Sequence, residues 1–126
     1  MMNWDQIRQL RQRGHIVGSH TLTHPNLAYL GKPLILREMA ESKRILEENL
    51  GEPIFHFSYP GPILEPHYSK ETRSLSEKIG YNTAVTSVWG AVGKEDNPLA
   101  LRRVPAPSAA LEFRWSLENA FLGKVV

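Results

Sequence analysis

The sequence predicts an α/β fold in which parallel strands are covered by helices. Segments with helical periodicity alternate with short apolar or β-branched segments, and this helix-then-strand order occurs four times along the chain. Because parallel strands are joined by crossover segments, the alternation favours one parallel sheet with helices packed on it. A chain of 126 residues is long enough for a single domain with a modest core.

The first two predicted helices have clear ends. Asn3 is a suitable N-cap for an amphipathic helix over 3–13, because a glutamine follows it three residues later. The longest helix is predicted over 33–50 and is followed by a glycine stop. Its charged residues, Glu38 among them, are interpreted as a solvated face.

The remaining elements follow in alternation. The strands are predicted at 15–18, 54–57, 81–86 and 101–104, a loop at 27–32, a longer loop at 87–98, and two further helices at 69–79 and 108–121, capped by Ser69 and Ser108. The last helix carries Phe113, Leu117, Ala120 and Phe121 on its apolar side. We expect the strand ends to meet at one edge of the sheet.

Two histidines follow the first predicted strand and are the first candidates for chemistry. His20 and His24 are four residues apart, so one helical turn would place both rings on one face, where they can bind one metal ion. Pro25 should end that turn. Solvated or capping histidines are the alternative interpretation. His15, at the start of the strand, is expected to be structural.

Other candidates lie on later loops. The loop after the second strand, 58–67, is rich in proline and therefore stiff, and it ends at His67. Trp89 would either offer an exposed ring for a ligand to stack on or fill the core. Of Arg102 and Arg103, one should face inward or toward a carboxylate, or both lie solvated on an edge strand.

These stretches resemble a known family. Gly14-His15-x-x-Gly18-Ser19-His20-Thr21-x-Thr23-His24-Pro25-x-Leu27 is similar to the second motif of the polysaccharide deacetylases, the NodB-homology enzymes of carbohydrate esterase family four. Phe57-Ser58-Tyr59-Pro60-Gly61 resembles their third motif. Gly80-Tyr81-x-x-Ala84-Val85-Thr86 and Leu101-x-Arg103-Val104 resemble the end of one branch of the family. The resemblance implies an incomplete, distorted (β/α) barrel.

The resemblance also implies roles for individual residues. His20 and His24 would bind a divalent metal, with zinc the first choice among zinc, cobalt and nickel. The backbone N–H of Gly61 would donate to the oxyanion, although the family usually has tyrosine there and glycine at the next position. Tyr59, Pro60 and Trp89 would contact the substrate, an N-acetylated polysaccharide.

Part of the family's active site has no counterpart in these residues. The Asp-Asp pair of the first motif, which supplies a metal ligand and the base, is missing, and so is the closing Leu-x-His motif. Four acidic residues were considered as substitutes, and none follows a strand in the Asp-Asp arrangement: Asp5, Glu52, Glu65 and Asp96. We therefore expect 1–126 to be one partial deacetylase domain, truncated and inactive or weakly active alone. The alternative is a non-catalytic module of this fold that binds metal or glycan or assembles with a partner.

Composition and charge narrow the classes of function that the sequence is compatible with. A formal charge of +2 without a sustained basic run does not indicate a nucleic-acid partner. Cysteine is absent, so thiolate sites are excluded. The sequence contains no apolar run of membrane-spanning length and no signal-peptide pattern, so as written the chain would stay in the cytoplasm, whereas the resembled enzymes are often extracytoplasmic. Exposed strand edges favour a homo-oligomer.

Overall fold

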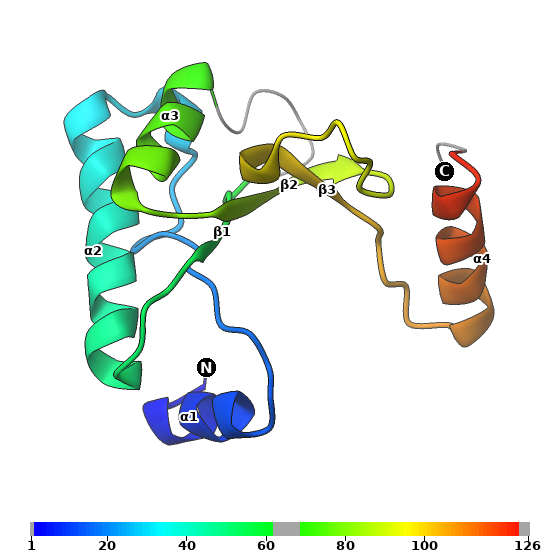
Figure 1. The fold of residues 1–126 in the computed structure, drawn as a ribbon, viewed down its shortest axis with the longest axis horizontal. Helices are drawn as coiled ribbons and strands as arrows, with labels where there is room; N and C mark the ends of the chain where they lie inside the picture. Colours follow the sequence, from blue (N-terminus) through cyan, green and yellow to red (C-terminus); the bar gives the residue numbers. More distant parts are fainter. Residues whose placement is uncertain (1, 62–68, 124–126) are drawn as a thin grey trace.

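A parallel sheet lies at the centre of the structure. The computed structural model describes residues 2–61 and 69–123. Strands β1 (His56–Ser58), β2 (Thr83–Trp89) and β3 (Leu101–Arg103) pair in the order β1-β2-β3, and both pairings are parallel (Figure 1). The predicted α/β class is thereby confirmed.

The strand predicted over 15–18 is reduced to a single point of pairing, one residue later. The Ser19 N–H donates to the carbonyl of His56, and the Ser58 N–H donates to the carbonyl of Ser19, each at 2.8 Å. No other residue of this segment pairs with a strand in the part of the chain that the structure describes. The apolar run therefore predicts the parallel direction of the segment correctly, but not the length of the strand.

Two helices cover one face of the sheet. Helices α2 (Lys32–Leu50) and α3 (Lys70–Ile79) pack against each other (Figure 1). Ser69 caps α3, as predicted. Each helix ends at a glycine in the left-handed conformation, with φ of +70° at Gly51 and +95° at Gly80, a conformation that glycine adopts without steric cost.

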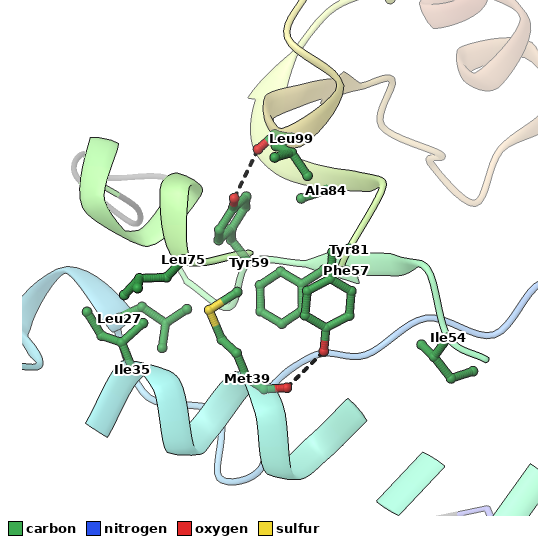
Figure 2. Packing of buried hydrophobic residues seen from close by; sticks show 10 residues of the cluster. All are labelled: Leu27, Ile35, Met39, Ile54, Phe57, Tyr59, Leu75, Tyr81, Ala84 and Leu99. Atoms are coloured by element: carbon green, nitrogen blue, oxygen red, sulfur yellow. Dashed lines mark hydrogen bonds between the residues drawn. The ribbon is translucent and has the colours of Figure 1, made fainter. Parts of the chain in front are cut away.

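The core lies between these helices and the sheet. Figure 2 shows Met39 of α2 beside the aromatic rings of Phe57 and Tyr81, whose ring centroids are 5.0 Å apart. The ten side chains of the cluster are Leu27, Ile35, Met39, Ile54, Phe57, Tyr59, Leu75, Tyr81, Ala84 and Leu99. Leu27 enters from the 3₁₀ helix η1 (Leu27–Tyr29), which replaces part of the predicted loop, and Leu99 from η2 (Pro98–Ala100).

The strand boundaries differ from those predicted. Strand β1 begins two residues later than expected, and β2 continues through Trp89 into the predicted loop 87–98. The reason is pairing, because β2 meets β3 at Val85↔Leu101 and again at Trp89↔Arg103, with an irregularity between the two points. Contact with a neighbouring strand extends β2 beyond its β-branched segment.

The first helix forms as predicted but packs loosely. Helix α1 (Trp4–Gln12) begins with a capping box between Asn3 and Gln6. None of its residues is fully buried. An ion pair between Arg11 and Glu52 ties it to the turn after α2.

The last helix stands apart from the sheet. Helix α4 (Ala110–Phe121) follows an extended segment and lies away from the other helices in Figure 1. The predicted cap at Ser108 is wrong, since Ala109 occupies the N-cap without a side-chain hydrogen bond. The apolar side is exposed in part: Phe113 and Phe121 are 39% and 83% accessible, whereas Ala120 is buried. In the described ranges, no helix is long and apolar enough to cross a membrane.

The close approach of the Ser19 segment to β1 depends on Gly18. A Cβ atom there would lie 3.0 Å from the carbonyl oxygen and 3.2 Å from the Cβ of His56. We expect Gly18→Ala to push the segment away from β1 and to lower the free energy of unfolding by about 1–3 kcal/mol, measured by urea denaturation. Gly93→Ala is the control, because its nearest contact would be 3.9 Å away. Equal stability of the two variants would contradict the close-packing argument.

Candidate functional site

The rings of His20 and His24 lie together at the carboxyl end of β1. Their centroids are 4.7 Å apart and their planes are inclined by 71°. Both residues are exposed. The Nδ1 atom of His20 is 2.8 Å from the carbonyl oxygen of Ser58, the last residue of β1. The two stretches with family-like motifs therefore touch, as the parallel arrangement predicts.

The contact with Ser58 defines the proton position on the His20 ring. A backbone carbonyl can only accept a hydrogen bond, so Nδ1 of His20 must carry the hydrogen. In the neutral ring, Nε2 then carries no hydrogen, and its lone pair is available to a metal ion. A histidine held in this way, with one nitrogen donating to a carbonyl, is the usual arrangement of a metal-ligating imidazole.

The backbone between the two histidines is not the helical turn that their spacing predicts. Thr21 and His24 have φ of +70° and +60°, in the left-handed region. A left-handed conformation is rare for a residue other than glycine, and especially so for a β-branched one. Each such residue costs about 1–3 kcal/mol, so surrounding contacts must hold the loop in this shape.

One set of contacts holds the start of the loop. Ser19 is buried, and its Oγ lies 2.7 Å from the Oγ of Ser42 on α2. Ser42 in turn donates to the carbonyl of Met39, and the Tyr81 hydroxyl donates to the same carbonyl at 2.9 Å. Burial raises the pKa of Tyr81, despite its hydrogen bonds with Ser19 and Ser42, so its hydroxyl stays a neutral donor.

A second set of contacts comes from Glu38 on α2. One carboxylate oxygen accepts from the N–H groups of Leu22 and Thr23, both at 2.9 Å, and the other accepts from the Thr23 hydroxyl at 2.7 Å. The interpretation of Glu38 as part of a solvated face is therefore wrong. The helical pattern places Glu38 among the outward residues. Only the tertiary path of the loop brings the donor groups of Leu22 and Thr23 to its carboxylate oxygens.

The loop after β1 forms the other side of the site. The side chains of Tyr59 and Pro60 are buried, and the Tyr59 hydroxyl donates to the carbonyl of Leu99 at 2.9 Å. The side chain of Tyr59 thus supports the loop from the core. Gly61 has φ of +153°, which side chains rarely adopt, so glycine suits this position where the resembled motif has tyrosine.

Trp89 and the two arginines lie at the far end of β2. Trp89 is 45% exposed, so it does not fill the core. Arg102 pairs with Asp96 at 2.8 Å, and Nε of Arg103 donates to the carbonyl of Thr86 at 2.6 Å. Both guanidinium groups thus have partners within the chain, and each helps to order the β2–β3 edge.

The histidine pair fits two positions of a metal site. Across residues 2–61 and 69–123, no group of three or more histidine, cysteine, aspartate or glutamate side chains is suitably placed to hold a metal. Three of the four carboxylates that are candidates to replace the Asp-Asp pair form ion pairs away from the histidines: Asp5 with Arg8, Glu52 with Arg11, and Asp96 with Arg102. Glu65 and His67 lie outside the described residues.

A sequence profile of the polysaccharide deacetylases matches residues 1–84, which is more than half of the chain. The chain belongs to the polysaccharide deacetylase family. YxkH of Bacillus subtilis (strain 168), which is assigned to the polysaccharide deacetylases, is 32% identical over 100 residues, or 79% of this chain.

Solved structures show the same fold. The deacetylase PplD of Streptococcus pyogenes, solved in complex with acetate, has a TM-score of 0.82 over 94% of this chain at 23% identity. A polysaccharide deacetylase from Bacillus cereus has a TM-score of 0.73 over 91% of this chain at 24% identity. These likenesses confirm a partial (β/α) fold of the NodB-homology type.

The deacetylase relatives are longer than this chain. It spans 34% of YxkH, 50% of the S. pyogenes chain and 36% of the B. cereus chain. The histidine pair and the loop after β1 lie within the span that matches the family profile, and Trp89 lies beyond it. The activity and the substrates of the complete relatives therefore belong to the proposed function of this chain.

The hydrogen bonds of Glu38 allow its titration to be followed from the N–H groups that donate to it. Partial burial raises the pKa of Glu38, but the hydrogen bonds from Thr23 and Leu22, with the charge of Arg37, outweigh this and hold the pKa below its ordinary value. The stabilisation is therefore present above the pKa of the unfolded state, about 4.3, and is lost as pH falls through the lower native value. We expect the amide NMR shifts of Leu22 and Thr23 to titrate together with a midpoint below that ordinary value.

Glu38→Gln is the control for this titration, because it removes the ionisable group from the same position. The shared transition should disappear in the variant. A wild-type midpoint at or above the ordinary glutamate value would contradict the hydrogen-bonding pattern described for the carboxylate.

Proposed function

We propose that this chain supplies the two-histidine part of a metal-dependent N-deacetylase site acting on N-acetylated polysaccharide. The observation that carries the proposal is the convergence of His20 and His24 beside the end of β1, with Nδ1 of His20 hydrogen-bonded to the Ser58 carbonyl. This arrangement leaves ring nitrogens available to one cation, in a chain of the deacetylase family.

The proposed chemistry is hydrolysis of an acetamide. A divalent metal, zinc in our proposal, would polarise the acetyl carbonyl and lower the pKa of a bound water. His20 and His24 would be two of its ligands. The N–H of Gly61 would donate to the oxygen that becomes negatively charged, which is a role for a fixed backbone donor on a stiff loop. The placement of Tyr59 and Pro60 in the core supports this stiffness.

The activity of these 126 residues alone should be low. Deacetylation also needs a general base and a group that protonates the leaving amine. The described residues contain no carboxylate grouped with the histidine pair. Two neutral imidazoles without an anionic ligand bind zinc weakly and activate its water poorly. We therefore propose that the chain is a partial active site that requires further residues for turnover.

The second candidate function is binding without catalysis. It is favoured by the exposure of Trp89, an aromatic side chain available to stack on a sugar ring, at the rim of the sheet. In this case the chain would bind glycan or metal, or assemble with a partner that covers its exposed surfaces. Self-association into a homo-oligomer belongs to the same proposal and stays a prediction.

Metal binding provides the first test. We expect zinc or cobalt to bind the wild-type chain weakly and His20→Ala or His24→Ala to weaken it about 10-fold or more, because each removes a ligand. Isothermal titration and anomalous diffraction between the two rings would measure this. His15→Ala is the matched control, since His15 is exposed and is not part of the pair. Equal affinity in all four proteins would contradict a shared metal site.

Acetate release provides the second test and separates the two candidate functions. We expect little or no release from N-acetylated chito-oligosaccharides with zinc by the 126-residue chain, and clear release by a form with the upstream genomic reading frame restored. The reason is that the longer form would supply the anionic ligand and the base. Activity in neither form would support the binding module. Full activity of the short chain would contradict the partial-site proposal.

A further inference from the structure

Helix α2 contacts the histidine loop at two places with side chains one turn apart. Ser42 contacts Ser19, directly before His20, and Glu38 contacts Leu22 and Thr23, between the two histidines. Side chains at positions i and i+4 share one face of a helix. The buried side chain of Met39 anchors the same part of α2 in the core. These contacts tie the loop to a rigid helix, in addition to the hydrogen bond within the loop from the His24 N–H to Thr21 Oγ1 at 3.1 Å.

The two contacts differ in what they constrain. The backbone hydrogen bonds between Ser19 and β1 already fix the position of Ser19. The contact with Ser42 is therefore a second support for the same residue. Leu22 and Thr23, in contrast, lie between the two left-handed residues, Thr21 and His24. Both backbone N–H groups in this interval donate to the single carboxylate of Glu38.

We propose that Glu38 is a positioning residue that holds the loop in the conformation in which the rings of His20 and His24 converge. Without its three hydrogen bonds, the strained backbone would relax away from the left-handed region, and His24 would lose its fixed place relative to His20. The consequence for metal affinity rests on the proposed function. The consequence for ring geometry does not.

The test compares Glu38→Ala with Glu38→Gln and with Glu41→Ala. Glu38→Ala removes all three acceptor contacts, and alanine favours the helix, so α2 should remain folded. In Glu38→Gln the side-chain carbonyl still accepts from the two backbone N–H groups. Glu41 lies on the same helix, where it pairs with Arg44, so Glu41→Ala removes the same charge without touching the loop.

The first measurement uses the metal-free chain. Nuclear Overhauser effects between the ring protons of His20 and His24 report the 4.7 Å approach of the two rings. We expect them to be lost in Glu38→Ala, retained in Glu41→Ala and largely restored in Glu38→Gln. Glu38→Asp, which keeps the charge but shortens the reach, should also weaken them. Retention of the effects in Glu38→Ala would overturn the proposal.

The second measurement is zinc affinity in the same proteins. Removal of an outer contact that orients a ligand typically costs 10–100-fold in metal affinity, and we expect Glu38→Ala to show a loss of about this size while Glu41→Ala keeps the wild-type value. If the wild-type chain and His20→Ala bind zinc equally, the proposed metal site fails, and the ring measurement decides the role of Glu38 by itself. If zinc binds through the histidines and Glu38→Ala binds it as tightly as wild type, the positioning role fails alone.

Discussion

The pair of backbone hydrogen bonds between Ser19 and β1 is the constraint on which the candidate site depends. It joins the histidine loop to the sheet in parallel with β1, so that His20 and Tyr59 leave the sheet at the same edge. Parallel pairing places the carboxyl ends of neighbouring strands side by side, and functional residues of α/β folds gather there. The contact between His20 and the Ser58 carbonyl follows directly from this pairing.

The shape of the loop depends on a balance between strain and hydrogen bonding. Two residues other than glycine adopt left-handed conformations, which the isolated segment would avoid. Hydrogen bonds to a charged group contribute about 1.5–3 kcal/mol each, and the carboxylate of Glu38 accepts three of them. Local strain at a proposed metal site is thus offset by contacts with a helix whose core face is well packed.

Membership of the deacetylase family is compatible with the small number of potential metal ligands that the described residues bring together. The family profile covers the histidine motif and the loop after β1, while the chain spans only 34% of YxkH. A metal site in this fold is assembled from the ends of several strands, so each segment supplies only some of its groups. In the proposed function, the described residues would supply two imidazoles and a stiff backbone loop, and other residues would complete the site.

The sequence by itself determined the α/β class, the helices with the caps at Asn3 and Ser69, and the two motifs that meet at the site. These features follow from periodicity, capping residues and glycine stops, all of which act over a few residues. Tertiary structure alone decided that the segment before His20 pairs at one residue, that β2 continues through Trp89, and that α4 stands apart. It also decided that Glu38 faces the loop, because its partners, Leu22 and Thr23, are distant in sequence and only the packing of α2 on the sheet brings them within hydrogen-bonding distance.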